Sequence, residues 1–451
     1  MSITRSTQAF FIVLLLSGAA ILSGCGTRGA SVEVLDTPGL VHISEAEANE
    51  RLVALTGVML TSADEVILAE DPNDPTVLKR ALEARLPILP KTKSSSALLT
   101  KLGATAATAG STADSNNSTA SSTLLLYGTD PTAAELHLSR IAGADMLHTT
   151  ADPRTDAESL TAIGNHDRVI VINSPRYPAE VVYNKASVAG GKYLLFDDQH
   201  FTAMYGHPSG PALGVLGEQN PEQSVERVKR LVAKYEASAP GVTFQPSFEI
   251  ITTIATAGPG PRKDYSGRTP IAELRPLIDL AKKEGVTVIL DLQPGRASML
   301  EQAQFYEELL LEPHVGLALD PEWKLGKKGK PLQRIGHVSA KQVNEVSAWL
   351  ADLTRENVLP QKMFVLHQFQ TQMIRDRDKV RTDHPELATV IHVDGQGPTA
   401  AKHSTWNHIR KNAPANVEWG WKNFIDEDVP MLNTTETWKQ VKPRPGLITY
   451  Q

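Results

Sequence analysis

The fold is decided by four apolar runs in the second half of the chain, each of which ends in ionisable or polar residues. They are VTVILDLQ (Val286–Gln293), VGLALDPEW (Val315–Trp323), MFVLHQ (Met363–Gln368) and ATVIHVDG (Ala388–Gly395). Side chains alternate across a strand, so two residues such as Asp320 and Glu322, at i and i+2, project to one side. This repeated pattern is typical of the mouth of a parallel barrel, where the βα loops collect the functional residues.

Working outward from these runs, eight strand candidates follow one another from residue 201, each with a helical or helix-length segment behind it. They are Phe201–Gly206, Phe244–Ile254, Val286–Leu292, Val315–Asp320, Met363–His367, Ala388–Val393, Glu418–Trp421 and Leu447–Tyr450. Eight such units over about 250 residues predict a (β/α)8 barrel of the TIM type for residues 193–451. A doubly wound sheet is the competing architecture, but a last strand at the very end of the chain suits closure better.

Residues 41–192 have a different texture, in which short strand candidates such as Asp64–Ala69 and Arg168–Ile172 alternate with helical segments such as Pro75–Arg85. This alternation predicts a small doubly wound α/β domain, so the fold class of the whole chain is α/β. Residues 91–122 are rich in Ser, Thr and Ala, and we expect a mobile surface insertion there because this composition buries little apolar surface.

The first 40 residues predict export. Arg5 supplies a positive charge, Phe10–Ala20 is a short apolar stretch, and small residues lead to Cys25. The stretch is too short to span a bilayer comfortably, since spanning takes roughly 20 residues. Residues 1–24 therefore form the expected signal peptide and 25–40 a tether. The tetrapeptide Leu22-Ser23-Gly24-Cys25 resembles the lipobox of bacterial lipoproteins, which implies cleavage before Cys25, a lipid on its sulfur and anchorage at the extracytoplasmic face of the membrane. An uncleaved membrane anchor is the alternative.

Composition excludes some classes of function. The chain has 45 Lys and Arg against 51 Asp and Glu, with a net charge of -6, so no electrostatic footprint for nucleic acid is present. Cys25 is the only cysteine, which excludes both disulfides and a structural zinc site of the cysteine type.

Two further resemblances concern the two predicted domains. The stretch SRIAGAD (Ser139–Asp145), with the strand–loop–helix of Ala63–Leu89, resembles the repeat unit of the type 2 cell-wall-binding family. That likeness implies wall attachment, and an α/β spacer is the alternative. Residues 193–451 resemble a set of uncharacterised exported proteins and lipoproteins of high-GC Gram-positive bacteria, in segments such as YGHPSGPALGVLGEQ and GWKNFIDED. This second likeness implies a barrel and an exported location, and no activity.

The candidate catalytic residues are carboxylates at the strand ends. Asp320 and Glu322 repel each other across one strand face, so one of them can be held protonated and act as a general acid. Glycoside hydrolysis needs such an acid and a second carboxylate, for which the candidates are Asp291, Glu249 and Asp394. The pair resembles the Asp-x-Glu strand end of barrel lysozymes and chitinases. An ion network that orders Lys324, Arg296 or Lys422 is the structural alternative.

The candidate substrate-binding residues also lie at or near strand ends. They are Tyr205, His207, Gln293, Arg296, Trp323, His367, Gln368, His392, Trp419 and Lys422, with Tyr450 as a further candidate. Flat aromatic faces are common in sugar-binding clefts, although core packing explains tryptophans such as Trp406, Trp421 and Trp438 equally well.

These features predict a lipid-anchored surface protein that binds or cleaves an envelope glycan such as cell-wall polysaccharide, with Glu322 as the acid and no cofactor. A non-catalytic wall-binding or scaffolding lipoprotein is one alternative. The other is metal-dependent hydrolysis of an ester or phosphodiester, in which His367, His392 and Asp394, completed by Asp320 or Glu322, hold zinc or manganese.

Overall fold

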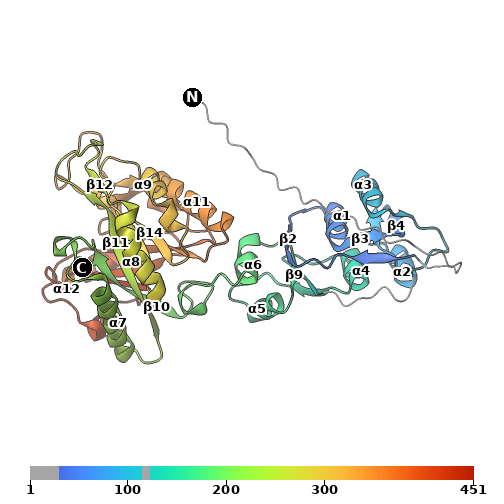
Figure 1. Cartoon of the computed structure of the whole chain (residues 1–451), viewed down its shortest axis with the longest axis horizontal. Helices are drawn as coiled ribbons and strands as arrows, with labels where there is room; N and C mark the ends of the chain where they lie inside the picture. Colours follow the sequence, from blue (N-terminus) through green and yellow to red (C-terminus); the bar gives the residue numbers. More distant parts are fainter. Residues whose placement is uncertain (1–29, 114–121) are drawn as a thin grey trace. The chain divides into compact units, whose positions relative to one another are not determined.

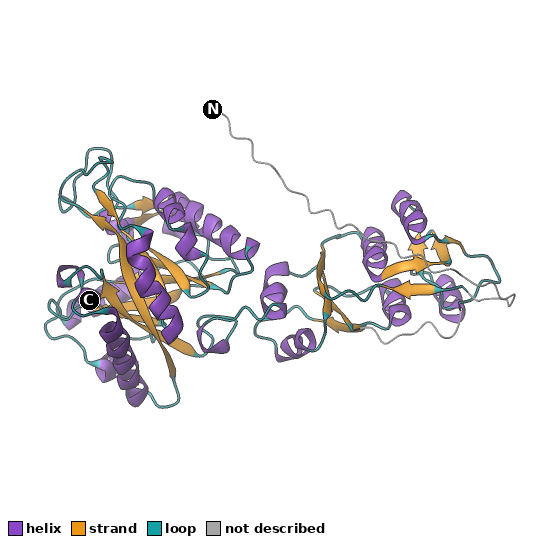
Figure 2. Cartoon of the chain, viewed as in Figure 1, coloured by secondary structure: helices purple, strands orange, loops and turns teal. Residues whose placement is uncertain are grey.

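The computed structural model of the chain describes residues 30–113 and 122–451, which fold as an α/β protein (Figures 1 and 2). The predicted signal peptide and its lipidation residue Cys25 lie outside the described residues. No helix within the described ranges is long and apolar enough to cross a membrane.

The chain divides into two compact units. Among the described residues, one unit comprises 30–35, 52–113 and 133–142, and the other comprises 36–51, 122–132 and 143–451. Residues 143–192 thus belong to the same compact unit as the barrel. The units therefore do not follow the predicted boundary between residues 192 and 193.

The first unit is built around strand β4, which pairs in parallel with β5 and β6, while β1 pairs with β3 in an antiparallel ribbon. Its strands are β1 (Val32–Val34), β3 (Leu60–Ala63), β4 (Glu65–Ala69), β5 (Ile88–Pro90) and β6 (Thr105–Ala106). Its helices are most of α1 (Ala48–Met59), then α2 (Pro75–Ala84), α3 (Lys93–Leu102) and α4 (Ala133–Ala142).

Two expectations for this region are corrected. The segment expected to be a mobile insertion begins with helix α3, which Thr92 caps and which buries Leu98 and Leu102, four residues apart on one helix face. The expected tether contains strand β1, because Val32 is buried where β1 pairs with β3. Residues 114–121 of the expected insertion lie outside the described residues.

The second unit contains a four-stranded parallel sheet with the order β2, β9, β7, β8. Its strands are β2 (Gly39–Ile43), β7 (Thr123–Tyr127), β8 (Asp145–His148) and β9 (Arg168–Ile172), and its helices are α5 (Ala157–Gly164) and α6 (Arg176–Tyr183). All residues of β7 and β9 are buried, as expected for central parallel strands.

The same unit contains a closed barrel of eight parallel strands. In order round the barrel they are β10 (Gln199–Gly206), β11 (Thr243–Ala255), β13 (Thr287–Leu292), β14 (Val315–Leu319), β16 (Lys362–His367), β18 (Leu387–Val393), β19 (Glu418–Asn423) and β20 (Leu447–Tyr450). Pairing of β10 with both β11 and β20 closes the ring. The predicted barrel is therefore confirmed, and each of the eight predicted strands overlaps one of these strands.

Helices cover the outside of the barrel (Figures 1 and 2). They are α7 (Pro221–Ser238), α8 (Ile271–Glu284), α9 (Met299–Phe305), α10 (Glu307–Leu310), α11 (Ala340–Glu356), α12 (Thr399–Ile409) and α13 (Thr434–Gln440). Two layers of buried apolar residues pack the strands against these helices, one around α8, α9 and α11 and the other around α12 and α13. Three short strands, β12 (Ser266–Arg268), β15 (Val338–Ser339) and β17 (Ile374–Arg375), belong to the loops at the mouth.

Candidate active site

The inside of the barrel changes character along its axis. Toward the amino-terminal ends of the strands it is apolar, with buried side chains that include Phe201, Ala203, Ile289 and Val365. Because alternate residues of a strand face the same side, the next inward positions after Ala203, Ile289 and Val365 carry Tyr205, Asp291 and His367. The same alternation that fills the lower barrel therefore brings a charged layer to the carboxyl-terminal end, where barrel enzymes work.

His367 lies at the centre of this layer and bonds to two carboxylates. Its Nδ1 lies 2.9 Å from Asp394 Oδ2, and its Nε2 lies 2.6 Å from Glu249 Oε1. All three side chains are buried. An imidazole that donates a hydrogen bond from each nitrogen is protonated, so the geometry favours an imidazolium between two carboxylates.

Asp291 and Tyr205 extend the cluster on its other side. The Tyr205 hydroxyl donates to Asp291 Oδ2 at 2.9 Å, and Asp291 Oδ1 lies 3.9 Å from His367 Nε2. His392 completes the group, with its Nδ1 3.3 Å from that of His367 and its Nε2 3.0 Å from Thr449 Oγ1. We call the group Tyr205, Glu249, Asp291, His367, His392 and Asp394 the acid–imidazole cluster.

The members of the cluster have different protonation states. Burial opposes protonation of His367, but Glu249 and Asp394 outweigh it and raise the pKa of the imidazole well above its usual value. Burial opposes ionisation of Asp394, yet the neighbouring His367 keeps the pKa of that carboxyl below its usual value. Burial and the positive His367 lower the pKa of His392, so it stays neutral.

Three carboxylate oxygens of the cluster are buried and have no hydrogen-bond partner among the described residues. They are Glu249 Oε2, Asp291 Oδ1 and Asp394 Oδ1. An unpartnered buried carboxylate oxygen is costly, and burial raises the pKa of Asp291 to about 6. These oxygens therefore retain unused capacity to accept hydrogen bonds in the buried layer.

Asp320 and Glu322 stand at the end of β14 and have different roles. Asp320 is buried, and its carboxylate accepts a 3.0 Å hydrogen bond from the backbone N–H of Glu322, which fixes the turn that presents Glu322. Glu322 is half-buried and lines a hollow of about 210 Å³ with Trp323 and Leu325, which we call the Glu322 hollow. Burial and the charge of Asp394 raise the pKa of Glu322 to about 7.

Two lysines offset the negative charge of this end of the barrel. The Nζ of Lys422 lies 3.5 Å from the centre of the Tyr205 ring. Lys402 reaches from α12 to Asp428, with its Nζ 2.8 Å from Oδ2, and also donates to the backbone oxygen of Lys422 at 2.6 Å. The second lysine therefore supports the end of strand β19, which carries the first.

Most of the predicted site residues converge at the mouth. Tyr205, Glu249, Asp291, His367, His392 and Asp394 form the cluster, and Gln293, Asp320, Glu322, Trp323 and Lys422 lie around it. The structure also brings in Thr449, whereas the residue predicted on this strand was its neighbour Tyr450. Thr449 is two residues after the interior residue Leu447 and so faces the same side of the strand. The period of two therefore predicts that Thr449, and not Tyr450, points into the barrel.

Three predicted residues point away from the barrel interior and are corrected. Tyr450 points outward to a hydrogen bond with Tyr235, and Trp419 packs on the outer side of β19 against Trp406. Gln368 follows His367 directly, so it points the other way and accepts from Arg377.

Two further predicted residues, His207 and Arg296, belong to the loops around the mouth and lie outside the acid–imidazole cluster. His207 bonds to Ser209 and Thr269, and Arg296 stacks over Tyr265 while its guanidinium donates to the backbone oxygen of Gly329. Trp406, Trp421 and Trp438 are buried in the outer core, as the packing alternative expects.

One group of side chains has the spacing of metal ligands. Glu249, His367 and His392 are buried and each offers a ligand atom, with these atoms within 4.8 Å of one another. The two histidines belong to the set predicted for a metal. A metal would replace the protons that His367 now shares with its carboxylates, because a ligating imidazole nitrogen must be unprotonated.

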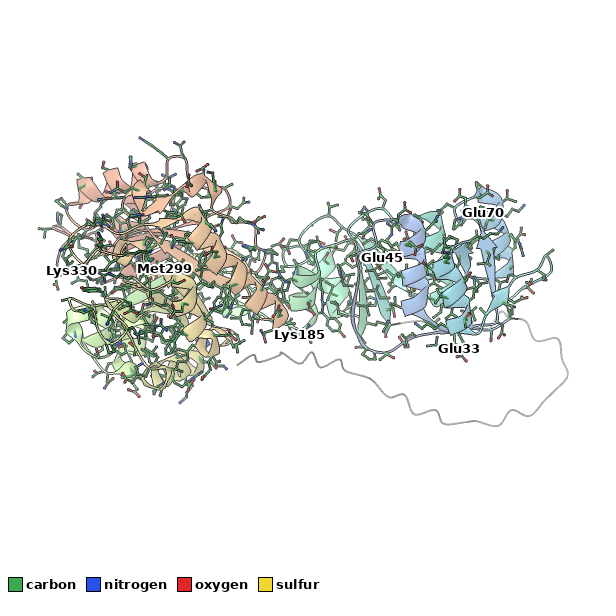
Figure 3. All side chains as sticks on the ribbon, turned by 90° about the horizontal axis from the view of Figure 1, so that it is seen from above. Glu33, Glu45, Glu70, Lys185, Met299 and Lys330 are labelled. Atoms are coloured by element: carbon green, nitrogen blue, oxygen red, sulfur yellow. The ribbon has the colours of Figure 1, made fainter. Side chains whose placement is uncertain are left out.

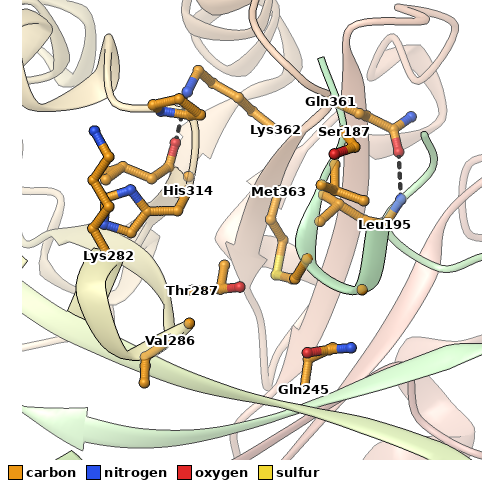
Figure 4. A pocket seen from close by; sticks show the side chains of 17 residues that line it. Ser187, Leu195, Gln245, Lys282, Val286, Thr287, His314, Gln361, Lys362 and Met363 are labelled. Carbon is orange, nitrogen blue, oxygen red and sulfur yellow. Dashed lines mark hydrogen bonds between the residues drawn. The ribbon is translucent and has the colours of Figure 1, made fainter. Parts of the chain in front are cut away.

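A separate cavity lies at the opposite, amino-terminal end of the barrel (Figure 4). It has a volume of about 390 Å³ and includes Lys362, whose Nζ donates to the backbone oxygens of Glu312 and Val315. Burial lowers the pKa of Lys362 to about 7. Since this end of a barrel usually serves stability, we assign the cavity no catalytic role.

Comparison of the chain with protein-family models, with curated proteins and with solved structures found no match.

Proposed function

We propose that the barrel is a glycoside hydrolase in which Glu322 is the general acid and Asp394 is the ionised second carboxylate. One observation carries the proposal: Glu322 lines a partly exposed hollow beside Trp323, and burial together with the charge of Asp394 raises the pKa of its carboxyl group to about 7. A pair of carboxyl groups with opposite proton affinities at one site is what acid-assisted glycoside hydrolysis requires.

The roles of the other residues follow from their contacts. Asp320 holds the turn that presents Glu322, and His367 keeps Asp394 ionised through a 2.9 Å hydrogen bond. Trp323 offers an aromatic face beside the acid, which suits a sugar ring. The substrate in this proposal is an envelope glycan such as cell-wall polysaccharide. The protein reaches it from the extracytoplasmic face of the membrane through a lipid on Cys25.

The test is the activity of purified protein on isolated cell-wall polysaccharide, measured as released reducing sugar. Glu322→Gln keeps the size of the side chain but cannot donate the proton, so we expect activity to fall by about 10²–10⁴-fold. Glu356→Gln, an exposed position at the end of α11, is the matched control and should leave activity unchanged. Full activity in Glu322→Gln would refute the assignment.

A second candidate, metal-dependent hydrolysis of an ester or phosphodiester, is favoured by the grouping of Glu249, His367 and His392. Zinc or manganese would be held by these three side chains and would activate a water molecule. Elemental analysis of the purified protein separates the two candidates. Stoichiometric metal, with activity lost on chelation and restored by zinc or manganese, would favour this candidate over the first.

A further inference from the structure

A second pocket at the mouth is lined mainly by basic side chains. It has a volume of about 510 Å³, and its charged or ionisable lining residues are Arg296, Lys324, Lys327, His337 and Arg375. We call it the basic pocket. Leu325 lines both the basic pocket and the Glu322 hollow, so the two spaces are neighbours.

Regular backbone pairing holds these residues together. Arg296 directly follows Gly295, which forms a β-bridge with Lys324, and the backbone N–H of Leu325 donates to the oxygen of Gly295 at 2.7 Å. On the other side, β15 pairs with β17 and places Arg375 opposite Ser339. The pocket is therefore formed by the loops after β13, β14 and β16, and the loop after β14 also carries Glu322.

No acidic side chain in the described part of the chain pairs with the positive charges of the pocket. Within residues 30–113 and 122–451, no ion pair joins Arg296, Lys324, Lys327 or Arg375 to a carboxylate. The Nζ of Lys324 donates to the backbone oxygens of Arg296 and Leu325, at 3.3 and 3.4 Å. Like charges that are gathered in one pocket repel one another.

Two of the five groups have a lowered pKa, and one of them, His337, reports this repulsion. Burial lowers the pKa of Lys324, with no acidic group to offset it. Burial together with the positive charges of Arg375, Arg334 and Lys324 lowers the pKa of His337. An anion in the pocket would remove the repulsion that these groups now experience.

We propose that the basic pocket binds an anionic group of the ligand, either a carboxylate or a phosphate. The neighbouring unit of the same ligand occupies the Glu322 hollow. Arginine and lysine are the side chains best suited to such oxygens. The inference rests on the proposed function, because that function makes the ligand a glycan. The basic pocket narrows this ligand to an acidic glycan. Binding itself does not depend on catalysis.

Calorimetric titration of the full chain with three oligomers tests the inference. Oligogalacturonate carries carboxylates, oligo(glycerol phosphate) carries phosphodiesters, and chito-oligosaccharide is neutral. We expect one of the two charged probes to bind more tightly than the neutral one, and to lose affinity as salt is added. Which charged probe binds identifies the anionic group. If neither charged probe binds more tightly than chito-oligosaccharide, the inference is wrong.

The matched variants use four basic residues of the mouth loops. Lys327→Ala with Arg375→Ala removes two exposed charges that line the pocket, and Lys328→Ala with Lys330→Ala removes two exposed charges that do not (Figure 3 labels Lys330). We expect the first double variant to weaken binding of the charged probe by about 10-fold or more, and the second to change it less than about 3-fold. Equal weakening by both would show nonspecific attraction and overturn the inference.

Failure of this inference is distinguishable from failure of the proposed function. Glu322→Gln should still bind the charged probe more tightly than chito-oligosaccharide even though it no longer cleaves glycan. If Glu322→Gln retains cleavage, the proposed acid is wrong while the basic pocket is still tested by binding. If cleavage depends on Glu322 but the pocket variants bind normally, only the pocket assignment fails.

Discussion

His367 Nε2 lies 2.6 Å from Glu249 Oε1, although the two residues are 118 positions apart and their strands are three steps apart round the barrel. The bond therefore crosses the barrel interior instead of following the sheet. Together with the bond from His367 to Asp394, it ties β11 to β16 and to the loop after β18. The charged layer is thus part of what closes the upper barrel as well as the candidate chemical site.

The first prediction concerns the dependence of cleavage on pH. Glu322 must be protonated to donate, and its pKa is raised to about 7, so kcat/KM should fall as pH rises through about 7. Asp394 must be ionised, and His367 keeps its pKa below the usual value, so activity should persist to about pH 4 or lower. The pH profile of hydrolysis checks both limbs. A high-pH limb that survives unchanged in Glu322→Gln would assign that limb to another group.

The second prediction concerns stability and His367. Because its pKa is raised in the folded protein, its protonated form stabilises the fold. That contribution is complete below the unfolded pKa of about 6.5 and is lost as pH rises through the higher folded value. At pH 6, His367→Gln should reduce the free energy of unfolding by about 3–5 kcal/mol, because it leaves buried carboxylates without their cation.

Urea unfolding at pH 6 and at pH 9 or above checks this prediction. The difference between His367→Gln and the unaltered chain should shrink at the higher pH. His408→Gln, an exposed position on α12, is the control and should change the free energy of unfolding by less than about 0.5 kcal/mol. A difference that stays constant with pH would show that His367 acts through packing alone. All six tryptophans lie between residues 323 and 438, so tryptophan fluorescence follows the barrel selectively.

The third prediction concerns a glycine that the histidine ring requires. A Cβ on Gly420 would lie 2.3 Å from His392 Cδ2, and the ring is enclosed by buried neighbours. Gly420→Ala should therefore reduce the free energy of unfolding by about 1–3 kcal/mol through overpacking. Gly164→Ala, where nothing lies within 4 Å of the added atom, is the control and should not destabilise the protein. Equal stability of the two variants in thermal unfolding would contradict the prediction.

The fourth prediction concerns the buried ion pair of Lys402 with Asp428, whose Nζ and Oδ2 atoms are 2.8 Å apart. Lys402→Met leaves a buried carboxylate without its cation and should cost about 3–5 kcal/mol. Adding Asp428→Asn to that variant should recover part of the loss. A double-mutant cycle measured by urea unfolding checks this coupling. Strictly additive effects would show that the two side chains act independently.

Much of the barrel could be predicted from sequence because each strand is an apolar run bounded by a helical segment. The period of two also placed Asp291 and His367 correctly at its mouth. The prediction that both Trp419 and Lys422 face the substrate was wrong. They are three residues apart on β19, and side chains alternate with a period of two, so they cannot share a face. Only Lys422 points inward, and Trp419 packs outside.

Other features depend on the third dimension. The contact between His367 and Glu249 is set by the tilt and stagger of the strands, which place residues from distant strands at one height in the barrel. No local pattern contains that information. Helix α3 was missed for a different reason, because its Ser and Thr residues mask the apolar face formed by Leu98 and Leu102. Burial of this apolar face stabilises the helix although the Ser- and Thr-rich composition of the segment predicts a mobile insertion.

The burial of the acid–imidazole cluster also isolates its protons from water. Both ring nitrogens of His367 are engaged and the side chain has no exposed surface, so a proton leaves only when the mouth opens. Exchange of these protons with deuterium, followed by NMR, therefore times the spontaneous opening of the barrel mouth. The exchange rate of the His367 ring protons thus measures the rate of that motion, and the measurement needs no ligand.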